Sequence, residues 1–169
     1  MKTLLLIITG LLTAFSTFAA ELNFSSLENG DSVELTLHAR GCFQNSTSWY
    51  EIRKSNGTCS LTKYAITWDK SVPAKIIEKK AIGELQLTQS DIAGLDSLLG
   101  YFRSKKQSST TTLISLQLEY YEGGRRIRVE NLEDESGGFD LRNRKDIVSF
   151  HELIERFHSS TNRPSAQAQ

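Results

Sequence analysis

Few residues of this chain have the types and spacing that catalysis or metal binding requires. Its three histidines are His38, His151 and His158. On a helix, His151 and His158 would lie two turns apart, roughly 10 Å along the axis, so both could not bind one zinc ion. We interpret both as surface histidines, and we expect no metal site and no cofactor.

Nucleophilic catalysis also lacks a sequence signature. Serines are numerous, but none lies in the Gly-x-Ser-x-Gly motif that places a serine nucleophile on a sharp turn. A dispersed site, assembled in space from His38 or from a pair of carboxylates, stays open as an alternative. The acidic run Glu133, Asp134 and Glu135 lacks the ligand spacing of a calcium loop, and we interpret it as a solvated turn.

The N-terminus has the pattern of a secretory signal peptide. Lys2 precedes an apolar stretch over residues 4–18 that is short for a membrane span, and the small residues Ala19 and Ala20 follow. We expect cleavage after Ala19, with cleavage after Ala20 or an uncleaved anchor as alternatives. The mature chain would then be exported to the periplasm or the extracellular space, without a stable membrane anchor.

Export sets the expected chemistry of the two cysteines, Cys42 and Cys59. They lack the Cys-x-x-Cys spacing of a redox-active pair. In an oxidising compartment we therefore expect a structural disulfide between them. A disulfide that closes so short a loop typically stabilises a fold by roughly 3 kcal/mol.

The net charge excludes one class of partner. The chain has 20 basic and 20 acidic residues, and loss of the leader removes only Lys2, which leaves 19 basic residues against 20 acidic ones. General nucleic-acid binding needs a strong basic excess on one face. We therefore expect no nucleic-acid partner.

A basic cluster at the predicted start of the second helix is one candidate binding site. It consists of Arg142, Asn143, Arg144 and Lys145. The macrodipole disfavours cations at a helix start, whereas the free N–H groups there attract anions. The negative partner is either a neighbouring acidic residue, which we favour because such pairs are common on helices, or an external carboxylate, sulfate or phosphate.

Aromatic residues on predicted strands are the second candidate. Neighbouring side chains of a strand point to opposite faces, so one residue of each adjacent aromatic pair should face away from the core. Trp49, Trp68 and Tyr121, with Arg126 beside Tyr121, could form a contact surface for a sugar, a peptide or a protein. The alternative, which we favour, is that a hairpin or loops cover this face.

Alternation of apolar and polar residues predicts the strands that would position these groups. Val33 and Leu35 belong to such an alternation, which places His38 on the outer side of the first strand. Asn56-Gly57 is a signal for a two-residue hairpin turn. The four strands expected in the first half of the chain cover residues 31–39, 48–54, 58–69 and 76–87.

Two amphipathic helices are expected. Thr88 can cap the first, with Asp91 completing a capping box, and apolar residues then recur at helical spacing. Gly94 and Gly100 within it indicate either a close approach to the sheet or a helix that depends on its packing. The second helix carries its apolar stripe through residues 147–157.

A hairpin with a two-glycine turn is predicted between the helices. Pairing across the turn places Tyr120 opposite Ile127 and Tyr121 beside Arg126. This register turns Ile127 and Val129 toward the core.

The order of elements, ββββαββα, predicts an α+β fold. We expect a mainly antiparallel sheet of about six strands with two amphipathic helices packed on one face. The expected organisation is a signal peptide at residues 1–19, an N-terminal linker at 20–30, a single domain at 31–158 and a mobile polar tail at 159–169.

The sequence favours a non-catalytic function over an enzymatic one. We expect an exported, disulfide-containing module that binds an extracytoplasmic protein, peptide or glycan through the sheet face or the basic helix start. The alternative is a small extracytoplasmic hydrolase. A concave pocket with His38 or clustered carboxylates in reach of a serine or threonine would favour the hydrolase.

Overall fold

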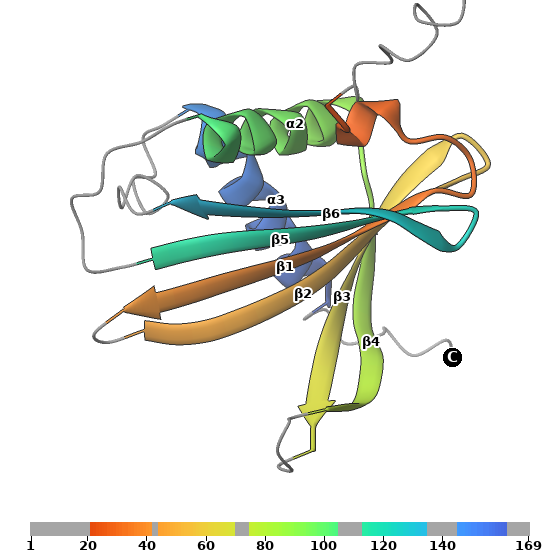
Figure 1. The fold of residues 1–169 in the computed structure, drawn as a ribbon. Helices are drawn as coiled ribbons and strands as arrows, with labels where there is room; N and C mark the ends of the chain where they lie inside the picture. The colour runs from red at the N-terminus through yellow and green to blue at the C-terminus, as the bar shows by residue number, and fades with distance from the viewer. Residues whose placement is uncertain (1–20, 42–43, 70–74, 105–112, 135–144, 162–169) are drawn as a thin grey trace, which may run out of the picture.

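A six-stranded antiparallel sheet and two long helices form the fold (Figure 1). The computed structural model describes residues 21–41, 44–69, 75–104, 113–134 and 145–161. The elements are η2 (Phe24–Ser26), β1 (Ser32–Gly41), β2 (Gln44–Ser55), β3 (Thr58–Trp68), β4 (Ile76–Gln86), α2 (Gln89–Arg103), β5 (Leu113–Glu122), β6 (Arg125–Asp134) and α3 (Lys145–Thr161). The predicted α+β class and the order ββββαββα are confirmed.

The strand order is β4-β3-β2-β1-β5-β6, so β1 lies between β2 and β5. Val33 and Leu35 of β1 are buried in a core shared with η2, α2 and α3. We call this side of the sheet the covered face. Glu34, Thr36 and His38 alternate with those residues and lie on the opposite side, which we call the open face.

The first long helix begins as the sequence predicts. The Thr88 hydroxyl accepts a hydrogen bond from the backbone N–H of Asp91 at 3.2 Å, and the Asp91 carboxylate accepts one from the backbone N–H of Thr88 at 2.8 Å. This reciprocal pair is the expected capping box.

Gly94 lies where the two helices approach each other. A Cβ atom at this position would lie 2.6 Å from the Cβ atom of Ser149 on α3, whereas a Cβ atom at Gly100 would meet nothing within 4 Å. Close approach therefore explains one of the two helical glycines, and it is an approach to α3 rather than to the sheet.

The segment predicted to be a linker is part of the packed domain. Phe24 is 1% exposed, and its backbone N–H donates to the Asp96 carboxylate on α2 at 2.7 Å. Leu27 is also buried in the core. The linker prediction for residues 20–30 is therefore wrong over residues 21–30. At the other end α3 continues to Thr161, and residues 162–169 of the predicted tail lie outside the described residues.

The register of the β5–β6 hairpin differs from the prediction. Tyr120 pairs with Arg128 rather than Ile127, and a β-bulge between Tyr120 and Tyr121 leaves Ile127 without a ladder partner. A shift of one residue turns side chains to the other face. Ile127 and Val129 are consequently 44% and 43% exposed instead of lying in the core, whereas the predicted pairing of Tyr121 with Arg126 is confirmed.

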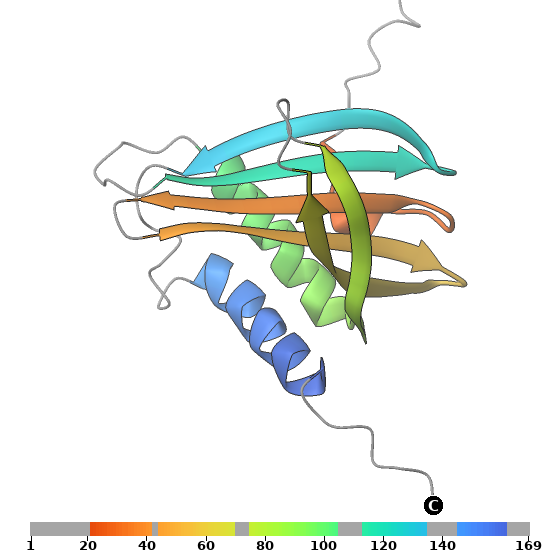
Figure 2. The same cartoon turned by 90° about the horizontal axis from the view of Figure 1, so that it is seen from below.

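The far ends of β3 and β4 bend over the open face. The ladder between β2 and β3 ends at Trp49 and Tyr64, and β3 continues to Trp68. Register shifts within the β3–β4 pairing accompany the bend. We call residues 65–68 and 76–80 the overhang. It points away from α2 in Figure 1 and crosses in front of the other strands in Figure 2.

An ion pair shows how strong the bend is. Lys79 of β4 binds Glu34 of β1 at 2.7 Å, although β3 and β2 lie between these strands in the sheet order. In a flat sheet the two strands would be about 14 Å apart. The overhang therefore brings β4 residues onto the open face.

Candidate functional site

Three carboxylates lie side by side across the open face. The register places Glu51 on β2 and Glu119 on β5 directly opposite Glu34 on β1. Like charges in this arrangement repel each other. Each carboxylate has a basic partner, and the pairs are Glu51 with Arg53 at 2.5 Å, Glu34 with Lys79 at 2.7 Å and Glu119 with Arg126 at 3.0 Å.

Two tyrosines complete this network. The hydroxyl of Tyr64 donates to Glu51 at 2.6 Å, and that of Tyr121 donates to Glu119 at 3.0 Å. Burial, together with the hydrogen bond to a carboxylate, raises the pKa of each tyrosine to about 12. Burial alone would raise the pKa of Glu51 and Glu119, but the hydrogen bonds they accept outweigh burial and lower both pKa values.

These ionisation states bear on the hydrolase alternative. A pair of carboxyl groups in a hydrolase needs one member that stays protonated near neutral pH and acts as the general acid. The lowered pKa values keep both Glu51 and Glu119 ionised, and their oxygens are engaged by basic and phenolic groups. Glu51 and Glu119 therefore lack the raised pKa of a general acid.

His38 is hydrogen-bonded to a threonine on the neighbouring strand. Its Nδ1 atom lies 3.0 Å from the Thr47 hydroxyl oxygen. Burial, with the charge of Arg40, lowers the pKa of His38, so the imidazole is neutral at neutral pH. A carboxylate commonly orients a catalytic histidine, whereas the charged neighbour here is a cation.

Two tryptophans meet at the other end of the open face. The ring centroids of Trp49 and Trp68 lie 6.0 Å apart with the planes tilted by 60°, because the overhang carries Trp68 back over β2. Trp68 is 46% exposed, and Trp49 is partly exposed. The exposed Thr47 lies two residues before Trp49 on β2, and its partner His38 lies on the adjacent strand β1. We call Trp49, Trp68, His38 and Thr47 the aromatic surface.

The structure separates the residues predicted to form one contact surface. Trp49 pairs with Thr36 on β1, whereas Tyr121 pairs with Ser32, four residues away along the same strand, or about 13 Å. Tyr121 and Arg126 both bind Glu119 and belong to the carboxylate network. Trp68 takes their place beside Trp49. No local pattern reveals this partner, because the contact depends on the bend of β3.

The thiol of Cys59 is free and partly buried, and burial raises its pKa. Cys42 lies outside the described residues. Its neighbour Gly41 pairs with Gln44, whereas Cys59 pairs with Lys54, ten residues further along β2, or about 33 Å in an extended strand. A disulfide requires Cα atoms within about 7 Å. The disulfide stays a prediction, and this separation weighs against it.

Most of the basic cluster predicted to bind an anion lies outside the described residues. Arg142, Asn143 and Arg144 lie outside the described residues, and Lys145 is described only as the first residue of α3. Anion binding there stays a prediction.

The acidic run begins within β6 and is not simply a solvated turn, because Glu133 and Asp134 pair with β5. Asp134 is fully buried and accepts a hydrogen bond from the Tyr101 hydroxyl of α2 at 2.5 Å, whereas Glu133 is exposed. Glu135 lies outside the described residues. Within the described ranges, no group of three His, Cys, Asp or Glu residues is placed to hold a metal ion.

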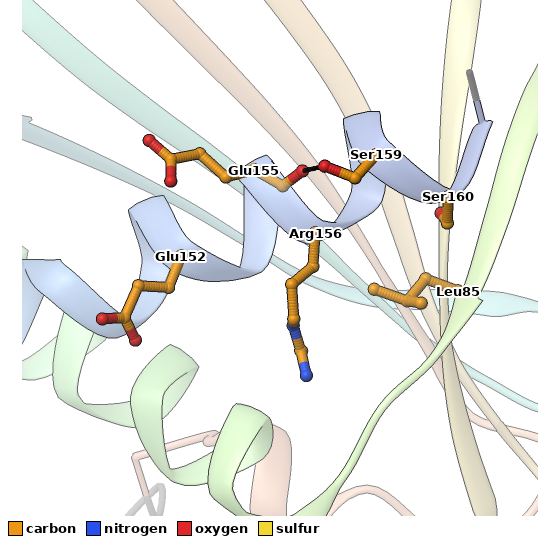
Figure 3. A pocket seen from close by; sticks show the side chains of 6 residues that line it. All are labelled: Leu85, Glu152, Glu155, Arg156, Ser159 and Ser160. Atoms are coloured by element: carbon orange, nitrogen blue, oxygen red, sulfur yellow. Dashed lines mark hydrogen bonds between the residues drawn. The ribbon is translucent and has the colours of Figure 1, made fainter. Parts of the chain in front are cut away.

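The largest hollow that we describe lies between α3 and β4 and has a volume of about 820 Å³ (Figure 3). Its lining consists of Leu85, Glu152, Glu155, Arg156, Ser159 and Ser160. Arg156 binds Asp91 of α2 at 2.5 Å, and the Ser159 hydroxyl donates to the backbone carbonyl of Glu155 at 2.9 Å. In Figure 3 the carboxylates of Glu152 and Glu155 point away from Leu85. These polar groups do not converge on a common point.

Comparisons of the chain with protein-family models, with curated proteins and with solved structures find no match. Within the described residues, neither long helix combines the length and apolar content needed to cross a bilayer. The geometry of the open face therefore provides the evidence for function.

Proposed function

We propose that this protein is an exported, non-catalytic module that binds a protein, peptide or glycan outside the cytoplasm through its aromatic surface. The exposed Trp49–Trp68 pair is the observation that carries the proposal. Large aromatic side chains supply much of the binding free energy where proteins contact their ligands. Two of them in contact on solvent-facing strands, with Trp68 46% exposed, are typical of a binding surface.

The signal-peptide pattern supports export. The first core residue of the domain is Phe24, only a few positions after the expected cleavage site at Ala19. Cleavage there leaves the whole packed domain intact. N-terminal sequencing of the protein from the exported fraction should therefore start at Ala20 or Glu21.

A capture experiment tests the binding function. The mature wild-type chain, the Trp68→Ala variant and an Arg126→Gln variant are immobilised, and each is exposed to the exported fraction of the producing cells. Arg126 is also exposed on the open face but belongs to the carboxylate network, so it is the matched control. We expect the wild type and the control to retain the same component and the Trp68 variant to lose it. Equal retention by both variants would contradict the proposal.

The hydrolase alternative predicts a different result. Turnover of ester, peptide or glycoside substrates should then be measurable and should be lost in Glu51→Gln, because this open-face carboxylate has both a phenolic and a guanidinium partner. We expect no turnover in either protein.

A further inference from the structure

We propose that the ligand of the aromatic surface is a neutral carbohydrate, whose ring stacks on Trp68 and Trp49 and whose hydroxyl groups bond to His38 and Thr47. This inference rests on the proposed function and specifies the class of ligand. Three features support it, namely the geometry of the tryptophans, the uncharged polar groups beside Trp49 and the place of the surface in the sheet.

The tryptophan geometry suits a sugar ring. A pyranose has faces of C–H groups and a rim of hydroxyl groups, and its C–H groups are attracted to the negative face of an indole ring. With centroids 6.0 Å apart and planes tilted by 60°, Trp49 and Trp68 offer two non-parallel surfaces. One sugar ring can therefore stack on the more exposed Trp68 while its edge contacts Trp49.

Beside Trp49 on the open face, His38 and Thr47 are polar and uncharged. Thr47 offers a hydroxyl group and His38 a neutral imidazole, and both can donate or accept hydrogen bonds as sugar hydroxyls do. The nearest carboxylate on β2, Glu51, is 8% exposed and engaged by Tyr64 and Arg53. Charged side chains flank this group, with the exposed Arg40 two residues beyond His38 on β1, and with Asp69 and the exposed Lys75 next to Trp68 and its strand partner Ile76. A neutral ligand needs a counter-charge from none of them.

The location of the surface disfavours two common modes of peptide binding. Strand addition uses a free sheet edge, but Trp49 and His38 lie on β2 and β1, each of which is paired on both sides. Only the part of β3 that carries Trp68 extends past its ladder with β2. Helix binding uses an apolar groove, whereas Thr47 and His38 are polar. A proline-rich peptide also stacks on aromatic rings, and it is therefore included in the test.

Isothermal titration calorimetry on the full mature chain tests the inference. The probes are neutral hexasaccharides of glucose, mannose, galactose and N-acetylglucosamine, with a decaproline peptide and a uronic-acid hexasaccharide in parallel. We expect at least one neutral hexasaccharide to bind at millimolar concentration or below, and the anionic one to bind more weakly. Trp68→Ala should weaken this binding by about tenfold or more, as removal of a central aromatic contact typically does.

Two further variants make the result specific. Ile82→Ala removes a different exposed apolar side chain, which lies on β4, and should leave binding unchanged. Trp49→Phe keeps an aromatic ring in the more buried position and should weaken binding less than Trp68→Ala does. Thermal unfolding of each variant verifies that the fold is retained.

The outcomes separate the inference from the proposed function. Failure of every neutral hexasaccharide to bind at millimolar concentration, or binding that is the same in the wild type and both tryptophan variants, would overturn the carbohydrate inference. If decaproline alone binds and requires Trp68, the inference fails and the proposed function stands. If neither probe binds and the capture experiment shows no dependence on Trp68, both fail.

Discussion

On the covered face, Arg103 of α2 binds Glu130 of β6 through two hydrogen bonds of 2.8 Å, and the two side chains are only 13% and 14% exposed. On the open face, Arg126 binds Glu119 through one contact of 3.0 Å, and the arginine side chain is 58% exposed. The same chemical pair therefore has two roles. The covered pair joins α2 to β6. In the open pair, Arg126 neutralises Glu119, one of the three carboxylates in the row on the open face.

Removal of Arg103 should have the largest effect on stability. Its guanidinium also donates to Asn23 and to the backbone carbonyl of Leu22, so it anchors the N-terminal segment. Arg103→Ala leaves Glu130 largely buried without its partner and should lower the free energy of unfolding by about 3 kcal/mol. Arg126→Ala should lower it by less than about 1 kcal/mol. Urea unfolding of the two variants gives the comparison, and equal losses would contradict it.

The covered pair should also make the fold sensitive to acid. Hydrogen bonds from Arg103 lower the pKa of Glu130, outweighing burial. A carboxyl group with a lowered pKa stabilises the fold above its ordinary pKa of 4.5, and this stabilisation is lost as the pH falls through the lower value of the folded state. The acid-dependent loss should therefore be smaller in Glu130→Gln than in the wild type.

The two helical glycines give the next largest difference. Gly94→Ala should destabilise the fold by about 1–3 kcal/mol, because the new Cβ atom would lie 2.6 Å from Ser149 and force the helices apart. Gly100→Ala meets nothing within 4 Å and should stabilise it by about 0.5–1 kcal/mol through helix propensity. Thermal unfolding should shift in opposite directions, and a shift of the same sign in both variants would refute the close approach.

The tyrosines should report the coupling on the open face without a large change in stability. Tyr64 and Tyr120 both have a pKa of about 12, and burial is the largest cause in each case. The next cause is Glu51 for Tyr64 and the charge of Glu130 for Tyr120. Because the pKa of each tyrosine is raised in the folded state, its contribution to the stability of the fold is present below pH 10 and is lost as the pH rises toward 12. Glu51→Gln should lower the pKa of Tyr64 and leave that of Tyr120 unchanged, as measured by ultraviolet titration. Identical changes in both would show that the faces are not independent.

The redox state of Cys59 can be tested with little effect on the fold. As the free thiol that the structure contains, Cys59 should react slowly with alkylating agents at neutral pH because burial raises its pKa. Mass spectrometry of the exported protein under non-reducing alkylation distinguishes a free Cys59 thiol from a disulfide. A peptide that links Cys42 and Cys59 would support the predicted disulfide and would require a different path for β2.

Much of the covered face could be predicted from the sequence, because its determinants are local. Alternation along β1 places Val33 and Leu35 in the core, and the Thr88–Asp91 capping box begins α2 where expected. The burial of Phe24 was missed, since Leu22, Phe24 and Leu27 in this short segment do not repeat over a length that defines a period. The register of β6 was missed because a bulge that skips one residue, Ile127, has no clear local signal.

The open face was less predictable, because its contacts join distant strands. The outward orientation of Trp49 and Tyr121 follows from strand alternation, and the pairing of Tyr121 with Arg126 follows from the hairpin. The contact of Trp49 with Trp68 and that of Glu34 with Lys79 require a bent sheet. Bending is the combined result of bulges and twist over several strands, so neither contact follows from residue spacing.

The aromatic surface can be tested most directly by nuclear magnetic resonance, because the chain has only two tryptophans. Each indole N–H gives one resonance, so the spectrum of the labelled protein reports Trp49 and Trp68 individually. During titration with the neutral hexasaccharides, we expect both indole resonances to move with the same binding curve. Binding that shifts resonances of α3 or of the charged network while both indole signals stay in place would contradict the account.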